Sequence, residues 1–183
     1  MFYSGCCSVA SPVDSAARAA ILTLGHSNHP FEHFLGLLRR HAITAVADVR
    51  SRPYTKYAKH FCREPLERLL RAQSIPYVFL GDLVGGKPAD PALLGPDGKP
   101  DYALISATPG FATGIERLIT GASTHVIALM CGEEDPTTCH RHHLITPALT
   151  ARGLTVRHIR GDGRIEDDAA LRVVPRVSLL DLG

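Results

Sequence analysis

The sequence predicts an α/β fold, a single three-layer domain in which helices flank a mostly parallel sheet of about five strands. Short apolar segments alternate along the chain with segments whose apolar residues recur at helical spacing. The apolar segments do not alternate regularly with polar residues, which indicates strands buried on both faces. The 183 residues fit one domain, which we assign to residues 21–183, and we expect residues 1–20 to form a mobile leader.

Apolar segments and helix-start signals define the expected elements in order. The predicted strands are Ile21–Gly25, Ile43–Val49, Ile75–Leu80, His125–Cys131 and Leu154–Ile159. Pro30 and Pro65 each open a predicted helix, because proline suits the first helical position and apolar residues follow at helical spacing. Two more helices are predicted over Phe111–Thr120 and Thr138–Arg152, the second closed by Gly153 in a left-handed cap.

Composition and charge narrow the class of protein. The formal net charge is only +2, so any attraction to a polyanion must come from local clusters of basic residues. No apolar run approaches the roughly 20 residues that span a bilayer, and the first twenty residues lack the pattern of a signal peptide. Five cysteines are an odd number with irregular spacing, which favours a reducing compartment. We therefore expect a cytoplasmic protein without a membrane partner.

The segment from Cys131 to Arg141 carries the strongest chemical signal. Parallel sheets bind ligands beyond the carboxyl ends of their strands, and this segment follows the fourth predicted strand. Cys131, Cys139 and His140 are candidate catalytic residues, because a cationic neighbour or a helix N-terminus stabilises a thiolate. Glu133 is a candidate general base or acid if its pKa is raised, and Arg141 is a candidate anion ligand.

Plainer roles for the same residues stay open. A cysteine at the end of a buried strand is often a small core residue, which applies to Cys131. Arg141 could pair with Glu133 or Asp48 and hold the loop.

A metal site is a weaker alternative. Cys131, Cys139 and His140 are ligand types that suit zinc, but their spacing matches no standard zinc motif. We expect His142 and His143 to lie on a helix surface. No metal or cofactor is required by the sequence.

A second cluster follows the second predicted strand. Asp48 lies near the tip of that buried strand, where a carboxylate is unfavourable unless it is paired or functional. A basic and aromatic loop comes next. Its candidate substrate-binding residues are Arg50, Arg52, Pro53, Tyr54 and Lys56. Arginines suit phosphate and tyrosines stack on bases, although a solvated surface loop with an Asp48–arginine pair would have the same pattern.

Two further loops add weaker candidates. His26, after the first predicted strand, is a possible proton carrier, and Ser27 is a possible substrate ligand. Gly85 and Gly86 would let the backbone approach a ligand closely, or would only make a turn. The segment Lys87–Pro100, rich in proline and glycine, is expected to be either an ordered insertion or a mobile lid.

Together these motifs resemble the DUF488 family. The matching segments, in the family's order over roughly residues 21–160, are Thr23–Ser27, Asp48–Arg50 with Pro53, Leu83–Gly86, Cys131-x-Glu133 and Cys139–Arg141. The resemblance implies an α/β fold and a shared polar site, and it brings no settled reaction. Position 55 is threonine where the family's loop often carries serine, a change that keeps the hydroxyl.

We expect a hydrolase or transferase acting on a phosphate-bearing substrate, a nucleotide or nucleic acid being favoured. In this hypothesis Arg50, Arg52 and Arg141 hold the anion, and Glu133 or Asp48 handles the proton. His26 or His140 assists, and Cys131 or Cys139 is a possible nucleophile. One alternative is a thiol-redox or sulfur-transfer protein that uses Cys131 and Cys139. Another is a ligand- or metal-binding module without turnover.

Overall fold

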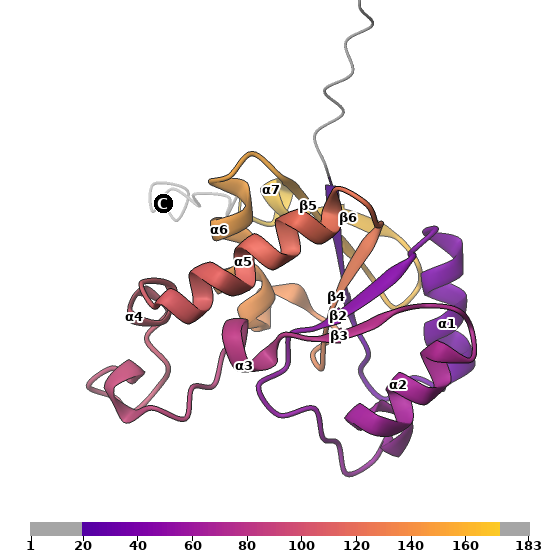
Figure 1. Cartoon of the computed structure of the whole chain (residues 1–183), viewed down its shortest axis with the longest axis horizontal. Coiled ribbons are helices and arrows are strands. Elements are labelled where there is room, and N and C mark those ends of the chain that lie inside the picture. The colour runs from indigo at the N-terminus through magenta and orange to yellow at the C-terminus, as the bar shows by residue number, and fades with distance from the viewer. Residues whose placement is uncertain (1–19, 173–183) are drawn as a thin grey trace, which may run out of the picture.

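The computed structural model describes residues 20–172 and contains a six-stranded sheet with helices on both faces (Figure 1). The strand order is β3-β2-β4-β1-β5-β6. The strands are β1 (Ala20–Gly25), β2 (Ala45–Asp48), β3 (Tyr77–Phe79), β4 (Ile127–Cys131), β5 (Thr155–Ile159) and β6 (Ile165–Asp167). Neighbouring strands are parallel except β6, which runs antiparallel to β5. The predicted three-layer α/β fold is confirmed.

Helices cover the two faces of the sheet unequally. The α-helices are α1 (Phe31–Arg40), α2 (Arg63–Arg71), α3 (Gly81–Val84), α4 (Tyr102–Ser106), α5 (Pro109–Ala122), α6 (Thr146–Thr150) and α7 (Asp168–Arg172). Short 3₁₀ turns are η1 (Lys59–Phe61), η2 (Pro91–Leu93) and η3 (Pro136–Thr138), and η4 (Arg141–Ile145) is a π-helix. One apolar layer packs α1 and α2 against the sheet, and a second packs α3, α5, η4 and α6 against its other face.

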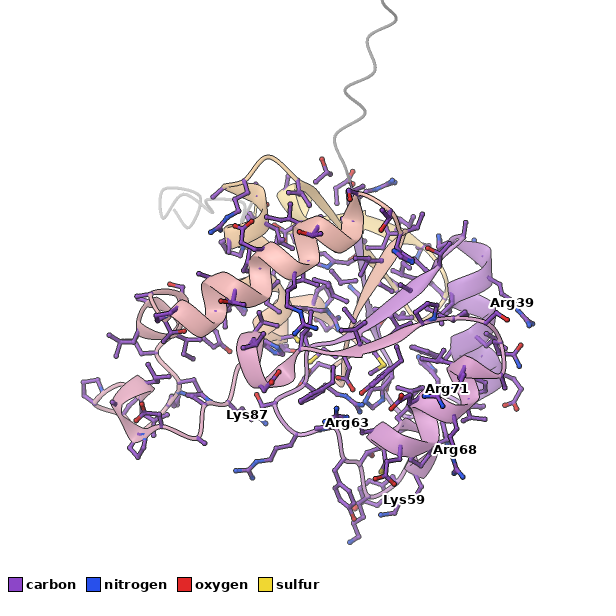
Figure 2. All side chains as sticks on the ribbon, viewed as in Figure 1. Arg39, Lys59, Arg63, Arg68, Arg71 and Lys87 are labelled. Atoms are coloured by element: carbon purple, nitrogen blue, oxygen red, sulfur yellow. The ribbon has the colours of Figure 1, made fainter. Side chains whose placement is uncertain are left out.

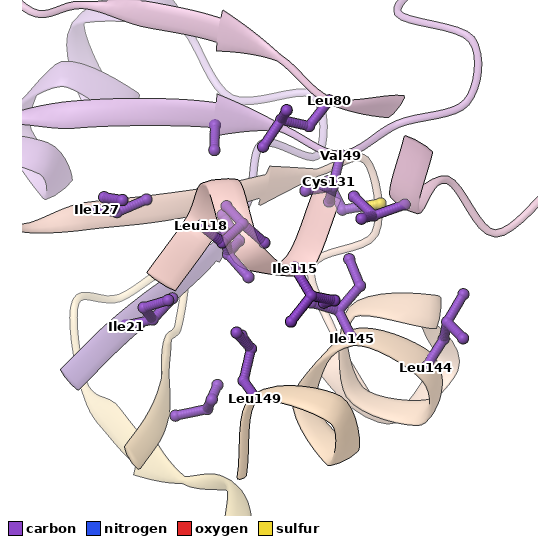
Figure 3. Packing of buried hydrophobic residues seen from close by; sticks show 14 of the residues in the cluster. Ile21, Val49, Leu80, Ile115, Leu118, Ile127, Cys131, Leu144, Ile145 and Leu149 are labelled. Atoms are coloured by element: carbon purple, nitrogen blue, oxygen red, sulfur yellow. The ribbon is translucent and has the colours of Figure 1, made fainter. Parts of the chain in front are cut away.

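The second apolar layer reaches the edge of the sheet where polar loops begin. It includes Ile21 and Ile127 from the strands and Ile115 and Leu118 from α5 (Figure 3). Cys131, at the end of β4, belongs to the same layer and is only 3% exposed. The alternative that Cys131 packs as a core residue is therefore confirmed.

Strand register brings three loops to one edge. Gly25 at the end of β1 pairs with Cys131 at the end of β4, and Asp48 at the end of β2 pairs with Met130. The amide of His26 then donates to the carbonyl of Cys131 at 2.9 Å. The loops after β1, β2 and β4 therefore start side by side, as the sequence predicted for a parallel sheet.

The prediction of one continuous helix over Thr138–Arg152 is wrong. After η3 the backbone is extended at Cys139, and only then do the π-helix η4 and the short α6 follow. Pro147 cannot donate a backbone hydrogen bond. The amide and the hydroxyl of Thr146 both bind the carbonyl of Arg141, which widens the turn. Gly153 does adopt the predicted left-handed conformation, with φ of 84°.

Other differences concern the ends of the domain. The sixth strand was not predicted, because Ile165–Asp167 is short and mostly polar. Apart from Ala20, the expected leader lies outside the described residues, as do residues 173–183 of the assigned domain. Among residues 20–172, no helix combines the length and apolar character needed to cross a bilayer.

Candidate active site

A cleft of about 610 Å³ opens at the carboxyl edge of the sheet. It is walled by the loops after β1, β2 and β4 and by the start of the Lys87–Pro100 segment. The sequence-predicted residues that line it are His26, Ser27, Arg50, Arg52, Tyr54, Gly86, Cys131, Glu133, Cys139 and His140. Ten candidates from four separate loops therefore meet at one site.

Two thiols and one imidazole form the centre of the cleft. Cys131 Sγ and Cys139 Sγ each lie 3.7 Å from Nδ1 of His140. Both cysteines are almost fully buried, at 3% and 2% exposure, yet they contribute to the cleft wall. The backbone amide of Arg141 also points at Cys139 Sγ, at 3.5 Å.

Glu133 places a carboxylate next to these thiols. Cys131 Sγ donates to Glu133 Oε2 at 2.9 Å. Burial alone would raise the pKa of Glu133, but hydrogen bonds from the Cys131 thiol, its own backbone and the Cys139 thiol lower it to about 2. The contact with Cys139 and burial raise the pKa of the Cys131 thiol well above its usual value. The cleft therefore holds an ionised carboxylate beside a neutral Cys131 thiol.

The orientation of His140 is fixed from outside the cleft. Its Nε2 donates to the carbonyl oxygen of Val49 at 3.0 Å, and Nδ1 faces the two thiols. Burial lowers the pKa of His140, but its contacts with Cys131 and the Val49 carbonyl outweigh burial and raise the pKa above 6.5. Gly86 packs directly against the ring: a Cβ there would come within 2.4 Å of His140 Cβ and 2.6 Å of Cγ. The sequence suggested that the backbone at Gly86 approaches a ligand closely, and in the structure it closely approaches the side chain of His140.

Asp48, Arg50 and His26 form a buried chain of hydrogen bonds under the cleft. Asp48 accepts from Arg50 Nε at 2.9 Å and from the Tyr77 hydroxyl at 2.7 Å. Arg50 also donates to Asp48 Oδ2 at 2.6 Å, to the carbonyl of Phe61 at 2.8 Å and to His26 Nε2 at 2.9 Å. The expected Asp48–arginine pair is confirmed, and four of the five N–H groups of the guanidinium have protein partners.

Both ring nitrogens of His26 also have protein partners. Because Arg50 donates to Nε2, the proton of the ring lies on Nδ1, which donates to the carbonyl of Ser27 at 2.6 Å. The ring also stacks on Phe61, with centroids 4.3 Å apart. Burial and the positive charge of Arg50 lower the pKa of His26 to about 4. His26 is therefore a neutral residue that positions Arg50, and its geometry does not support the proton-carrier role.

Arg141 corrects the sequence analysis. Its side chain is fully buried, at 0% exposure, and it does not line the cleft. It donates to the carbonyl of Glu133 at 2.6 Å and to that of Glu134 at 2.7 Å. Arg141 therefore holds the Glu133 loop, as the plainer alternative expected, but it does so through two backbone carbonyls and not through a carboxylate.

Several other candidates lie outside the cleft wall. Asp48, Pro53, Lys56 and Gly85 do not line it. His142 is buried instead of lying on a helix surface, because the π-turn directs it toward Asp168, with Nδ1 2.5 Å from Oδ1. His143 is exposed as expected.

The cleft also contains residues that the sequence analysis missed. Lys87 extends the basic rim, and it was treated only as the start of a possible lid. Of the Lys87–Pro100 segment, only Lys87 lines the cleft, and the rest forms turns around η2 with a bridge between Leu94 and Pro100. The remaining unpredicted lining residues are Asn28, Ser51, Thr55, Tyr102, Gly132, Glu134 and Thr138.

The mouth of the cleft is basic and aromatic. Arg52, Tyr54 and Lys87 are exposed lining residues, with Tyr54 at 67% exposure. Lys59 donates to the Tyr54 hydroxyl at 2.8 Å and lies over its ring, 4.3 Å from the centroid. Figure 2 shows Lys59 with further basic side chains of α2 on the same part of the molecule.

Comparison with known proteins gives a family and no closer relative. The model of the family described as domain of unknown function DUF488 matches residues 30–146. The search of curated proteins and the search of solved structures returned no significant match.

Proposed function

The chain belongs to the DUF488 family, and we propose that it is a hydrolase or transferase acting on a phosphate-bearing substrate, a nucleotide or single-stranded nucleic acid. One observation carries the proposal: cations, an exposed tyrosine and the ionised carboxylate of Glu133 line the same cleft. The cations and the tyrosine would hold the substrate, and Glu133 would take part in proton transfer.

The mouth suits an anion attached to a planar base. Within residues 20–172, no acidic side chain forms a salt bridge with Arg52 or Lys87, so both charges are free to meet phosphate. Tyr54 is 67% exposed beside them, with Lys59 over one face of its ring, and a base of any identity could stack on the other face. The basic run from Arg50 to Arg63 contains no aspartate or glutamate.

The carboxylate of Glu133 is the group in the cleft that could accept a proton from the reacting oxygen. Glu133 lines the cleft and is ionised at neutral pH, but its pKa of about 2 makes it a weak base before substrate binds. The proposed role therefore requires that the bound substrate and the loss of the Cys131 hydrogen bond raise this pKa. Asp48 has no exposed surface, and its contacts with Arg50 and Tyr77 already use its carboxylate. Of the two carboxylates that the sequence offered for this role, we therefore assign Glu133.

Binding tests the substrate class. Fluorescence anisotropy with a labelled single-stranded oligonucleotide, repeated over a salt series, compares the parent protein with Arg52→Ala and Lys87→Ala. Each substitution should weaken binding and reduce the slope of log affinity against log salt by about 1. Arg117→Ala is the matched control, because Arg117 is exposed on α5 and does not line the cleft. No binding by the parent, or equal losses in all three variants, would remove the proposed substrate class.

Thiol chemistry is the second candidate, because one contact favours it. Cys131 Sγ and Cys139 Sγ lie within 4.8 Å of each other, close enough for a disulfide after a small rotation of the side chains. Intact-mass analysis with an alkylating reagent would identify reactive thiols. If Cys131 and Cys139 both stay unmodified at neutral pH in the folded protein, this candidate is removed.

A further inference from the structure

We infer that Cys131, Cys139 and His140 form a transition-metal site, with zinc as the ion their chemistry favours, at the floor of the cleft. The inference deepens the proposed function, since it rests on the same cleft and supplies the electrophile that phosphate chemistry would use. It also gives the two cysteines a role as ligands instead of nucleophiles.

The distances between the three ligand atoms suit one ion. Zinc binds sulfur at about 2.3 Å and imidazole nitrogen at about 2.0–2.1 Å, so a tetrahedral site separates the two atoms by about 3.6 Å. The observed separation from His140 Nδ1 is 3.7 Å for Cys131 Sγ and 3.7 Å for Cys139 Sγ. All three atoms lie within 4.8 Å of one another.

Hydrogen bonds account for only part of this arrangement. Cys131 uses its single S–H on Glu133 Oε2, at 2.9 Å, so this thiol has no proton left for His140 Nδ1. The nitrogen nevertheless lies 3.7 Å from both sulfurs. A single ion would receive the lone pair of His140 and both sulfurs together.

The surroundings of His140 are those of a metal ligand. A ligating histidine usually donates its second ring N–H to a carbonyl or carboxylate, which fixes the tautomer and the ring orientation. His140 Nε2 makes this contact with the carbonyl of Val49 at 3.0 Å. Gly86 leaves no room for the ring to move toward it.

Three protein ligands leave one position of a tetrahedral ion for water or substrate, as in catalytic zinc sites. All three residues line the cleft, so that position is reached from the mouth. Glu133 Oε2, at 2.9 Å from Cys131 Sγ, is closer than the roughly 3.5 Å expected between two ligands of one ion. Glu133 is therefore placed beside the ion and not among its ligands. Binding of an ion would remove the S–H of Cys131 that makes this contact, which would free the carboxylate to accept a hydrogen bond from water at the open position.

A second cluster of possible metal ligands, formed by His142, His158 and Asp168, has different geometry. His142 Nδ1 and His158 Nε2 lie 2.5 and 3.0 Å from Asp168 Oδ1. These are hydrogen-bond distances, and Arg172 already neutralises the carboxylate while Thr23 binds the other nitrogen of His158. This cluster is a satisfied polar network, and we assign no metal to it.

The test is metal binding by the full-length protein. Reduced, chelator-treated protein is titrated with cobalt(II), whose visible and near-ultraviolet absorption reports tetrahedral geometry and thiolate ligation, and zinc is then added in competition. We expect one equivalent of cobalt with a thiolate-to-cobalt band, displaced by one equivalent of zinc. Cys131→Ser and Cys139→Ser should each weaken zinc binding at least about a hundredfold, beyond the loss of an outer-shell partner.

Cys62→Ser is the matched control, because Cys62 is a free cysteine outside the cluster and should bind metal like the parent. Circular dichroism shows whether each variant folds, and His140→Asn provides an independent ligand deletion. Absence of the thiolate band in the parent would overturn the inference. So would metal binding retained in folded Cys131→Ser and Cys139→Ser. Oligonucleotide binding through Arg52 and Lys87 is measured on metal-free protein, so failure of the metal site is distinguishable from failure of the proposed function.

Discussion

The Nε2 atom of His140 lies 3.0 Å from the carbonyl oxygen of Val49. His140 belongs to the loop after β4, whereas Val49 directly follows β2, so the contact joins two neighbouring strand ends. It fixes the ring from behind and leaves Nδ1 facing Cys131 and Cys139. The geometry of the site therefore depends on the backbone around His140 as much as on the reactive side chains.

Gly86→Ala tests this dependence. The added Cβ would lie 2.4 Å from His140 Cβ, a distance at which the imidazole must move. We expect cobalt affinity to fall by about tenfold to a hundredfold, as for other disturbances next to a ligand. Gly36→Ala is the control, since a Cβ there meets nothing within 4 Å and lies in α1, where alanine stabilises a helix by about 1 kcal/mol. Unchanged cobalt affinity in Gly86→Ala would contradict the tight packing.

Asp48→Ala tests the buried ion pair. The substitution leaves Arg50, only 7% exposed, without its 2.6 Å partner. Removing one member of a buried pair destabilises a protein by about 3–5 kcal/mol, and we expect a loss of that size in urea unfolding. Arg50→Met combined with Asp48→Ala should lose less than the two single changes added together. A loss below about 1 kcal/mol in Asp48→Ala, the range of a surface pair, would show that the pair is not desolvated in solution.

Tyr54 and Tyr57 form a matched pair for the stacking hypothesis. Both rings are exposed, at 67% and 81%, but only Tyr54 lines the cleft. Tyr54→Ala should weaken oligonucleotide binding by about 1–3 kcal/mol, the range for one stacked base, while Tyr57→Ala should have a smaller effect. Anisotropy at one fixed salt concentration measures both. Equal effects would place the nucleic acid on the outer loop instead of in the cleft.

The polar network around His158 predicts a pH dependence of stability. Burial lowers the pKa of His158 below its ordinary 6.5, outweighing the opposing effect of Asp168, with Arg141 and His142 adding to the lowering. Below pH 6.5 the unfolded chain therefore binds more protons at this residue than the folded protein does. The free energy of unfolding should fall as the pH drops from 6.5 toward the lowered folded pKa, and this contribution should be complete above pH 6.5.

Urea unfolding at several pH values measures this slope. His158→Gln should flatten it, whereas His125→Gln, which changes an exposed histidine, should leave it as in the parent. His26, with its pKa lowered to about 4, contributes a slope of the same sign in the parent and in both variants. A slope in His158→Gln equal to that of the parent would show that His158 is not buried as a neutral residue.

Sequence patterns located the strands and the loops but not the use of each side chain. The apolar segments ending at Gly25, Asp48 and Cys131 predicted the parallel sheet, and its register brings their loops together. Whether an arginine faces substrate or protein depends on atoms from distant segments. Arg50 donates to the carbonyl of Phe61 as well as to Asp48, and Arg141 donates to two carbonyls of the loop before it.

The local backbone conformation was the second feature that the sequence did not predict. The run from Cys139 to Gly153 has a helical pattern, yet Pro147 removes a donor and Thr146 closes a π-turn instead. That turn buries His142, which an ordinary helix would have left on the surface. The role of Lys87 was missed for a similar reason, because only the folded structure places it at the mouth of the cleft.

Turnover tests the proposed function most directly. The protein is incubated with a panel of nucleotides and single-stranded oligonucleotides, and products are separated by chromatography for the parent and for Glu133→Gln. We predict a product in the parent reaction, and a rate reduced by about 10²–10⁴ in Glu133→Gln with oligonucleotide binding retained, as expected for loss of a general base. Equal rates in the two proteins, or no product from any member of the panel, would contradict the assignment of this cleft as a phosphate-directed active site.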